Sequence, residues 1–481
     1  MNTPNIMLAV TNLNAEIVVI GSGPGGYTAA FRAADLGKKV ILVERETTMG
    51  GVCLNMGCIP TKTLLHAAKV ITEAEAITPH GISFGEMKVD LEKLREWKSA
   101  GVVAKLTNGL DSMAMQRQVT IVKGNGRFIS EHQLEVMTES GSRTIIKFDY
   151  AIISVGSSAI KIPDIAADPR IMDSTDALQL HDIPKRMLVI GGGIIGMELG
   201  TVYDAFGSKI SVVQRPDRLM TDCDRDLIRP LQKRMEKRFE KIMLGTKVVK
   251  IEPKDDGIHV EFEGDNAIAP QVYDRVLVAI GRKPNGNQIC AENAGVLVDE
   301  FGFIKVDKQM RTNVPHILAV GDVVGHPMLA HKASHEGKIA AETIAGFNIE
   351  TQVLTIPSVA YTDPEVAWAG ITENEARVKG IEIEKVTFPW AASGRALSIG
   401  RSEGLTKLIF DGKTHQLLGA GIVGTNAGEL IAEAVLAIET GTSADKLGLT
   451  IHAHPTLSET VSFAAEMKTG TITDLYMRKK M

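Results

Sequence analysis

Hydrophobic and polar positions follow the same order in two stretches of the chain, which begin about 170 residues apart. The first stretch reads EIVVIGSGPGGYTAAFRAADLGKKVILVER, and the second reads RMLVIGGGIIGMELGTVYDAFGSKISVVQR. In each, a run of apolar residues enters a cluster of glycines, and a helical pattern then leads into a second apolar run. This order predicts a strand, a tight turn, a helix and a strand, so the chain contains two βαβ units.

Two further apolar runs close the blocks that these units open, AIISVG at 151–156 and RVLVAIG at 275–281. From Ile356 onward, short apolar runs alternate with helical patterns. The predicted fold is α/β, with two doubly wound, Rossmann-like dinucleotide-binding domains and a C-terminal α+β domain. The predicted segments are residues 1–155, 156–281, 282–355 and 356–481.

Composition narrows the possible partners of this chain. Its 481 residues are 44% hydrophobic and 23% charged, values typical of a folded globular protein. With 53 Lys and Arg against 58 Asp and Glu, the net charge of -5 argues against a nucleic-acid or anionic-membrane surface. The first 15 residues lack Lys and Arg, so they are interpreted as a frayed leader and not a secretory signal. No apolar run reaches the roughly 18 residues that span a bilayer, and a cytoplasmic protein is expected.

The first glycine turn has the spacing of a dinucleotide site, with Gly21, Gly23 and Gly26 in the pattern GxGxxG. The first glycine allows the tight turn, the second lets the backbone approach a pyrophosphate, and the third lets the helix pack on the strand. The next strand ends at Glu44, at the distance where a carboxylate binds a ribose diol. The alternative is a glycine-rich turn that binds no ligand.

The second turn repeats the pattern with Gly191, Gly193 and Gly196. The residue equivalent to Glu44 is Gln214, which is followed by Arg215. An amide binds a ribose without repelling a 2'-phosphate, and an arginine attracts one, so these residues leave the choice between NAD and NADP open. Two dinucleotide domains indicate two bound cofactors that relay electrons, and a non-catalytic sensor of two nucleotides is the alternative.

Cys53 and Cys58 lie five residues apart in GGVCLNMGCIPTK, directly after the first βαβ unit. In a regular helix their Cα atoms would be roughly 8 to 9 Å apart, too far for a disulfide, so a bonded pair requires distorted backbone. Gly57 supplies flexibility, and Pro60 suits the first turn of a following helix. A helix N-terminus stabilises a thiolate, which favours redox chemistry over an inert pair of thiols.

Two other roles for the pair are less well supported. A structural staple over so short a loop would contribute only about 2 kcal/mol. A metal site would need two more soft ligands, and Cys223 and Cys290 are isolated, so no metal is predicted.

Together with the two glycine turns, the cysteine segment resembles the flavin-dependent disulfide reductases. The resemblance covers nearly the whole chain, because further family strings occur in the family order, namely ISVGS, VIGGGIIGMELG, VLVAIGR, ILAVGDVVG, PMLAHKASHEG, AYTDPEVAWAG, FPWAASGRA, GAGIVGTNAGELI and IHAHPTLSE. It implies FAD in residues 1–155, with 282–355 completing that site, and NAD in 156–281. It also implies that 356–481 forms the interface of a homodimer.

The resemblance assigns roles residue by residue. Gly21, Gly23, Gly26 and Glu44 are expected at the adenosine half of FAD, and Asp322 of AVGD at its ribityl chain. Lys62 matches the family lysine near the flavin N5, and Glu198 matches its carboxylate partner. Gly191, Gly193, Gly196 and Gln214 are expected to bind NAD, and Gly126 and Gly281 complete the predicted cofactor-binding set.

Cys53 matches the family cysteine that exchanges with substrate, and Cys58 the one that lies against the flavin. His454 and Glu459 of HAHPTLSE match the family's base and its orienting acid, with His452 as a bystander. In the family this histidine reaches the cysteines of the partner subunit. Without the resemblance, either histidine would more often be an ordinary loop or core residue.

Within this family the chain looks most like the branch that oxidises protein-bound dihydrolipoyl groups with NAD. The implied partners are the lipoyl domains of 2-oxo acid dehydrogenase acyltransferase subunits. The alternatives are another disulfide reductase, such as a glutathione-reductase-like enzyme, and a non-catalytic flavoprotein subunit. The chain departs from the family pattern at two places. It has Gln214 where the family has a glutamate, and Ser154-Val155-Gly156 where the family has ATG.

Overall fold

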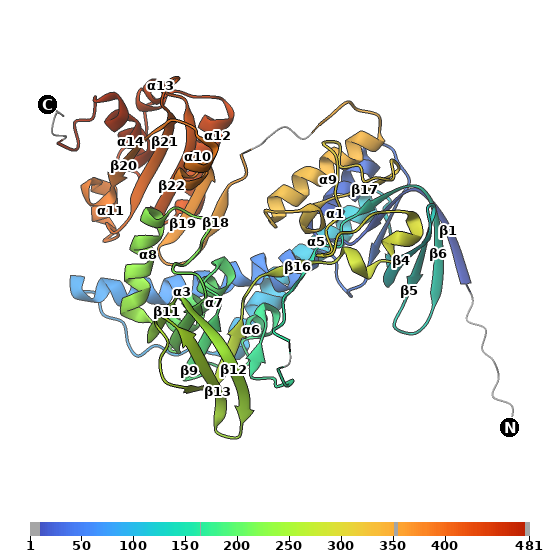
Figure 1. Cartoon of the computed structure of the whole chain (residues 1–481), viewed down its shortest axis with the longest axis horizontal. Helices are drawn as coiled ribbons and strands as arrows, with labels where there is room; N and C mark the ends of the chain where they lie inside the picture. The colour runs from blue at the N-terminus through green and yellow to red at the C-terminus, as the bar shows by residue number, and fades with distance from the viewer. Residues whose placement is uncertain (1–9, 164, 351–354, 477–481) are drawn as a thin grey trace. The chain divides into compact units, whose positions relative to one another are not determined.

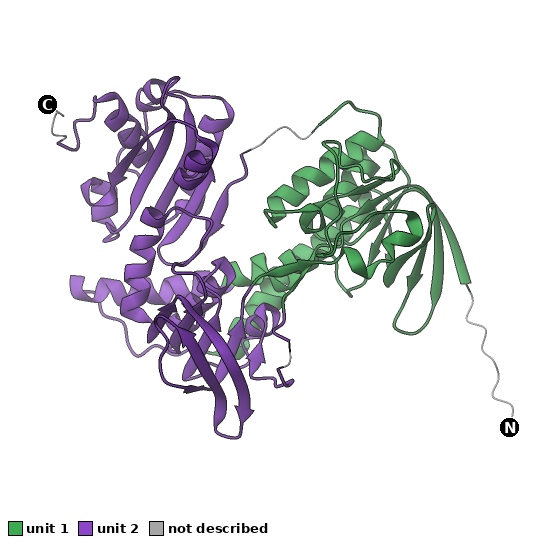
Figure 2. Ribbon diagram, viewed as in Figure 1, with its two compact units in different colours: residues 1–63, 90–160, 281–353 green, residues 64–89, 161–280, 354–481 purple. Residues whose placement is uncertain are grey.

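The computed structural model describes residues 10–163, 165–350 and 355–476 (Figure 1). Figure 2 shows two compact units, each assembled from separate stretches of the chain. Unit 1 contains 1–63, 90–160 and 281–353, and unit 2 contains 64–89, 161–280 and 354–481. The predicted boundaries near 155, 281 and 355 lie close to three of the crossings between units. Residues 64–89 belong to unit 2 although they fall in the first predicted segment, and the four-segment division stays a prediction.

Unit 1 is built on a seven-stranded sheet in the order β3-β2-β1-β6-β5-β4, with β17 paired to β6. The strands are β1 (Val10–Ile20), β2 (Val40–Glu44), β3 (Thr120–Lys123), β4 (Asn125–Ser130), β5 (Gln133–Met137), β6 (Arg143–Ile153) and β17 (Ile317–Ala319). The neighbours β3, β2, β1, β6 and β17 pair in parallel, whereas β4, β5 and β6 pair antiparallel. The helices of this unit include α1 (Pro24–Asp35), α2 (Gly51–Met56), α4 (Leu91–Glu96), α5 (Ala104–Gln116) and α9 (Ala330–Ile344). Apolar residues of α1, α9 and β1 share one core.

The predicted leader is wrong for its described part, because strand β1 begins at Val10. This strand pairs with β6 from Val10 opposite Arg143 to Ile20 opposite Ile153. Its first residues are mostly exposed and its last four are buried. The start of β1 is polar, so the hydrophobic pattern of the sequence did not predict a strand there, although its backbone pairs with β6. Residues 1–9 of the predicted leader lie outside the described residues.

Unit 2 contains the second doubly wound sheet, all parallel, in the order β11-β10-β9-β15-β8. Its strands are β8 (Ile171–Met172), β9 (Arg186–Ile190), β10 (Lys209–Gln214), β11 (Lys241–Leu244) and β15 (Arg275–Val278). Helix α7 (Ile194–Ala205) follows the glycine turn after β9, as predicted. An antiparallel sheet of β12 (Thr246–Lys254), β13 (Gly257–Gly264) and β14 (Gln271–Tyr273) belongs to the same part of the chain.

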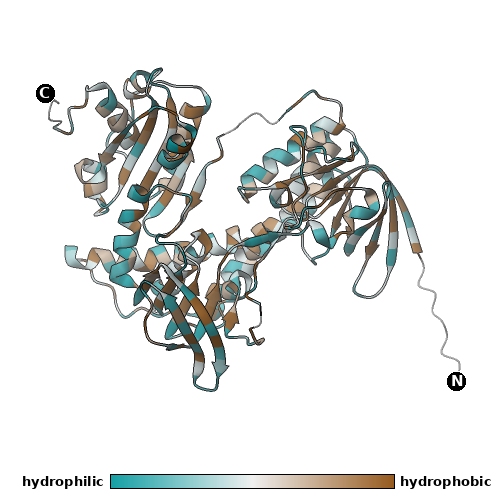
Figure 3. Ribbon diagram, in the orientation of Figure 1, coloured by the Kyte–Doolittle hydropathy of each residue, from teal (hydrophilic) through white to brown (hydrophobic). Residues whose placement is uncertain are grey.

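The C-terminal part of unit 2 is α+β, as predicted, with an antiparallel sheet in the order β18-β19-β22-β21-β20. The strands are β18 (Ser358–Ala360), β19 (Glu365–Gly370), β20 (Ile383–Pro389), β21 (Leu405–Asp411) and β22 (Leu417–Gly424). Its helices include α10 (Glu373–Lys379), α12 (Ala427–Glu439), α13 (Ala444–Gly448) and α14 (Glu459–Thr469). Trp390, Phe388 and Phe410 are fully buried in this core. Figure 3 shows the central strands as mainly hydrophobic, whereas α8 (Arg225–Arg238) is mainly hydrophilic.

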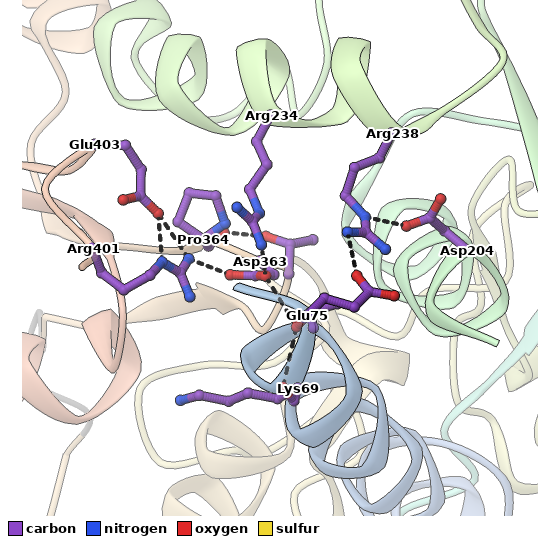
Figure 4. A network of polar contacts seen from close by, with 11 residues as sticks. Lys69, Glu75, Asp204, Arg234, Arg238, Asp363, Pro364, Arg401 and Glu403 are labelled. Atoms are coloured by element: carbon purple, nitrogen blue, oxygen red, sulfur yellow. Dashed lines mark hydrogen bonds and ion pairs between the residues drawn. The ribbon is translucent and has the colours of Figure 1, made fainter. Parts of the chain in front are cut away.

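Helix α3 (Cys58–Ile77) begins at the second cysteine, and its later turns belong to unit 2. There Arg238 of α8 binds Glu75 at 3.1 Å and also pairs with Asp204 of α7 (Figure 4). Lys69 donates to the Asn426 side chain at 3.0 Å. Ion pairs and hydrogen bonds thus attach the C-terminal part of α3 to other elements of unit 2.

Asp363 makes hydrogen bonds and ion pairs with several side chains beside α3 (Figure 4). Its carboxylate pairs with Arg234 of α8 at 2.6 Å and with Arg401, and the Thr72 hydroxyl of α3 lies 3.5 Å from it. Burial works to raise the pKa of Asp363, but the charges of Arg401 and Arg234 hold it below its usual value. Asp363 is therefore an ionised link between helices and the C-terminal sheet. Among the described residues, no helix has both the length and the apolarity to cross a membrane.

Candidate functional site

The first glycine turn leaves no room for side chains at two of its three glycines. Gly21 has φ +95°, and a Cβ there would lie 2.3 Å from the Ser154 carbonyl oxygen. A Cβ on Gly26 would lie 1.8 Å from the Gly21 carbonyl oxygen, because helix and turn are in contact. A Cβ on Gly23, by contrast, meets no atom within 4 Å. Since Gly23 caps the N-terminus of α1, this open space fits a dinucleotide pyrophosphate above the helix amides.

Glu44 is held against this turn at the end of β2. It is 5% exposed, and its Oε2 accepts hydrogen bonds from the Ser22 amide at 3.0 Å and from the Ser22 hydroxyl. Its Oε1 accepts from the Glu46 amide at 2.8 Å. The carboxylate is therefore placed beside the glycine turn, where the ribose of a dinucleotide would lie.

The second turn repeats this construction in unit 2. Gly191 has φ +113°, and a Cβ on Gly196 would lie 2.1 Å from the Gly191 carbonyl oxygen. Gly193 caps α7, and a Cβ on it meets nothing within 4 Å. Gln214 ends β10, and its Oε1 accepts from the Gly192 amide at 2.8 Å. This turn therefore fits a second dinucleotide, with a neutral amide in the place of a carboxylate.

The two remaining predicted glycines lie beside strand ends. Gly126 of β4 pairs with Val136, and a Cβ on it would lie 3.2 Å from the Val43 side chain of β2. Gly281 has φ +130°, and its carbonyl accepts from the Ile160 amide at 3.1 Å. Both sit near dinucleotide turns, and their roles stay predictions.

Asp322 lies in a short helix (Gly321–Val324) that follows β17. The residues that hold its side chain belong to the same unit. The Ser157 hydroxyl donates to its Oδ2 at 2.5 Å, and the Arg282 guanidinium donates to the Ser157 hydroxyl at 2.7 Å and to its carbonyl at 2.6 Å. Neither Ser157 nor Arg282 was predicted from the sequence. Each directly follows an apolar run, AIISVG or VLVAIG, but the two runs belong to different sheets. The two residues meet because the short strands β7 (Ser157–Ala159) and β16 (Arg282–Pro284) pair antiparallel, which no local pattern indicates.

The two cysteines meet because the backbone breaks between them. Cys53 lies in α2, Cys58 is the first residue of α3, and Gly57 separates the two helices with φ −150° and ψ −113°. A Cβ on Gly57 would lie 2.8 Å from the Val52 carbonyl oxygen. The two cysteine side chains are in hydrogen-bond contact. The distorted backbone that a close pair requires is present.

Electrostatics separate the roles of the two thiols. The hydrogen bond with Cys58 raises the pKa of Cys53 well above its ordinary value, and burial raises it further. The charge of Lys62 opposes this effect, and that of Asp322 adds to it. Cys58 starts a 20-residue helix, whose dipole favours a thiolate there. The helix start thus favours a thiolate at Cys58, whereas the hydrogen bond with Cys58 keeps the proton on Cys53.

Tyr27 of α1 is a neighbour of this pair that the sequence analysis did not identify. Burial raises its pKa, and negative charge on Cys53 or Cys58 raises it further, so the phenol stays neutral. Nothing in the pattern of α1 marked it, because only the folded chain brings α1 beside the cysteines.

Glu198 of α7 is 3% exposed, and its Oε1 accepts from the Tyr361 amide at 2.9 Å. It belongs to unit 2, whereas Lys62 belongs to unit 1. The pairing of Lys62 with Glu198 therefore stays a prediction.

His454 and Glu459 are brought together at the start of α14. The Glu459 Oε1 lies 2.8 Å from the His454 Nδ1, and the Glu459 Oε2 accepts from the Thr456 amide at 2.7 Å. The Glu459 side chain is 12% exposed and that of His454 is 79% exposed. A carboxylate that accepts a hydrogen bond from Nδ1–H leaves Nε2 of this exposed ring as the proton acceptor.

Comparisons with known proteins agree with this geometry. The family profile "Pyridine nucleotide-disulphide oxidoreductase" matches residues 15–337, and the dimerisation domain of the same family matches residues 356–465. The chain belongs to this family. The first match contains both glycine turns, the cysteine pair and Asp322. The second match contains the His454 segment.

Relatives of this oxidoreductase cover nearly its whole length. A dihydrolipoyl dehydrogenase of Vibrio cholerae is 56% identical over 96% of this chain and 97% of the relative. A dihydrolipoyl dehydrogenase of Bacillus subtilis is 42% identical, covering 95% and 97%. Among solved structures, the flavoprotein disulfide reductase RclA of Escherichia coli has a TM-score of 0.83 at 28% identity, covering 94% and 99%. LpdA of Mycobacterium tuberculosis shares the fold, with a TM-score of 0.87 at 22% identity, covering 95% and 99%.

Proposed function

We propose that this oxidoreductase is a dihydrolipoyl dehydrogenase, which oxidises protein-bound dihydrolipoyl groups and reduces NAD. FAD and NAD are its cofactors. The observation that carries the proposal is the Cys53–Cys58 contact at the break between α2 and α3, in the unit that also contains the first glycine turn. The full-length similarity to proteins named dihydrolipoyl dehydrogenase supports this substrate class.

The substrate half of the reaction is thiol–disulfide exchange at Cys53. His454 removes the proton of a substrate thiol through its Nε2, while Glu459 holds the imidazole and stabilises its positive charge. The thiolate attacks the Cys53 sulfur of the oxidised pair, the disulfide breaks, and Cys58 leaves as a thiolate. The second substrate sulfur then displaces Cys53, which releases the lipoyl disulfide and leaves both enzyme cysteines reduced.

The raised pKa of Cys53 and the helix start at Cys58 suit this order. Cys58 is a good leaving group because the N-terminus of α3 stabilises its thiolate, and Lys62 supplies a nearby positive charge. A bound FAD would supply the redox chemistry that connects the dithiol to NAD. Gly23 and Glu44 would hold FAD, with Asp322 positioned by Ser157, and Gly193 and Gln214 would hold NAD.

The partners are the lipoyl domains of 2-oxo acid dehydrogenase acyltransferase subunits and a second copy of this chain. The match of the C-terminal domain to a dimerisation domain supports the second copy. In the proposed homodimer, His454 of one subunit serves the cysteines of the other. A cytoplasmic location stays a prediction.

Turnover of dihydrolipoamide with NAD, compared with glutathione disulfide and NADPH, tests the substrate. We expect at least hundredfold higher kcat/KM with dihydrolipoamide, and the reverse order would contradict the proposal. C53S should abolish this turnover while keeping the flavin absorbance, because Cys58 and the cofactor site remain. The matched control, C290S, changes a cysteine remote in sequence from the redox pair and should retain turnover. A C53S enzyme that oxidised dihydrolipoamide would contradict the role of Cys53.

A further inference from the structure

Three side chains of the segment that leads to His454 make hydrogen bonds. Residues 449–455 connect α13 to the turn before α14, and all of them are exposed except His452, whose side chain is only 8% exposed. The Thr450 hydroxyl donates to the Lys446 carbonyl at 2.9 Å, and His454 contacts Glu459 at the start of α14. The contact of His452 with Glu433 attaches the segment to α12, so the position of its backbone depends on what holds His452.

Both ring nitrogens of His452 face hydrogen-bond acceptors. Nδ1 lies 2.8 Å from the Thr450 carbonyl oxygen, and Nε2 lies 2.7 Å from the Oε1 of Glu433 on α12. A carbonyl and a carboxylate can only accept, and a neutral imidazole has one N–H. Both contacts are satisfied together only when the ring carries two protons and a positive charge. The two distances match charge-assisted hydrogen bonds.

The charges around the ring favour the cation. Glu433 faces it from α12, and Glu466 faces it from α14. Burial raises the pKa of Glu466 and the charge of Asp474 raises it further, while the positive charge of His452 acts in the opposite direction. His454 lies two residues away, with its own carboxylate partner Glu459. The groups that face His452 are therefore acidic. The imidazole of His454 is neutral when it acts as a base, so it does not repel a charged His452 ring.

We propose that His452 is a positioning residue, which as an imidazolium bound to Glu433 holds the segment that presents His454 to the substrate. This inference rests on the proposed function, because it takes His454 as the base. Two contacts then define the place of His454: Glu459 holds its ring, and His452 holds the backbone two residues before it.

The anchor depends on the protonation of the ring. While the ring carries two protons, both of its hydrogen bonds are present. When the ring loses one of these protons, one of the two acceptors loses its donor, and the segment loses one of its attachments.

A pair of variants at Glu433 tests this role in the full-length holoenzyme. E433Q keeps a hydrogen-bonding group, and its amide can donate to a neutral His452 ring, so the anchor no longer needs a charged ring. E433A removes the partner. We expect kcat in E433A to fall about tenfold or more, because small displacements of a catalytic group reduce rates strongly. In E433Q, kcat should stay within about twofold of the native value, because the ring keeps both of its hydrogen bonds.

The protonation state can be read directly by NMR of enzyme labelled with 15N in histidine, with His452 assigned through H452Q. Two protonated ring nitrogens are expected in the native enzyme under the conditions of the assay, and one in E433Q. A neutral His452 in the native enzyme would overturn the proposal, as would E433A with a native kcat. Flavin content and dimer mass are the folding controls, and if E433A fails them the E433Q turnover and the NMR spectrum still decide. H454Q distinguishes a failure of the proposed function from a failure of the His452 anchor. Turnover in H454Q would refute the role of His454 as the base, whereas the NMR spectrum of His452 tests the anchor independently of that role.

Discussion

The two glycine turns are built alike and differ in charge. In both, the first glycine has positive φ, the third is too close to the first for a Cβ, and the middle one faces open space. In both, the residue that ends the second strand reaches back to the turn, Glu44 to Ser22 and Gln214 to Gly192. Steric requirements fix the same backbone in both turns, whereas the residue that ends the second strand differs in charge. Backbone geometry thus decides that a dinucleotide binds, and the side chain decides which one.

The largest expected effect comes from filling the closed position of each turn. A Cβ in G26A would lie 1.8 Å from the Gly21 oxygen and one in G196A 2.1 Å from the Gly191 oxygen, so helix and turn must separate, at a cost of about 3 kcal/mol or more. G26A should lose bound flavin. G196A should retain it and lose NAD reduction. Flavin absorbance per chain and steady-state turnover measure the two effects, and a colourless G196A would contradict the assignment of the turns.

Substitution at the open position should affect ligands without affecting folding. Gly23 and Gly193 have φ −65° and −81°, which any residue adopts, and a Cβ there meets no protein atom. We expect melting temperatures of the cofactor-free proteins to change by less than about 2 °C, because nothing in the chain is displaced. The methyl group would instead occupy space for the pyrophosphate. G23A should weaken FAD binding, and G193A should raise the KM for NAD, each by about tenfold or more. Unchanged binding in both variants would show that the dinucleotides do not use these turns.

Exchanging the strand-end residues tests the charge difference. In E44Q the amide group replaces one of the two oxygens that accept from Ser22 and Glu46, which should weaken FAD binding by about 1 to 2 kcal/mol. Q214E retains an oxygen for the Gly192 amide and adds a negative charge that repels a 2'-phosphate. Its ratio of kcat/KM for NADPH to that for NADH should fall about tenfold. A ratio that does not change would mean that the ribose lies elsewhere.

The smallest effect is expected from Arg215, which is exposed beside Gln214. If its charge attracts a 2'-phosphate, R215A should reduce kcat/KM for NADPH about two- to fivefold and leave that for NADH unchanged. The reduction should vanish at high ionic strength, because exposed charges are screened. An equal loss with both nucleotides would indicate a structural role for Arg215 instead.

Local patterns were sufficient for the parts of the fold that depend on burial and backbone geometry. The apolar runs before the glycines predicted β1 and β9, and the spacing of the glycines predicted turns that the Cβ distances explain. The polar residues at the start of β1 were wrongly interpreted as a leader, because that half of the strand is held by backbone pairing with β6 and not by a buried side.

The sequence by itself determined the two dinucleotide turns and the spacing of the cysteine pair, because these depend on residues close together in the chain. Only the tertiary structure decided that the break at Gly57 brings the two thiols into contact, and that Ser157 and Arg282 hold Asp322. The same holds for His452, which appeared to be a bystander until its ring was seen between Thr450 and Glu433. Such contacts join residues far apart in the chain, or depend on the direction of a ring, and no local pattern of hydrophobic and polar residues records either.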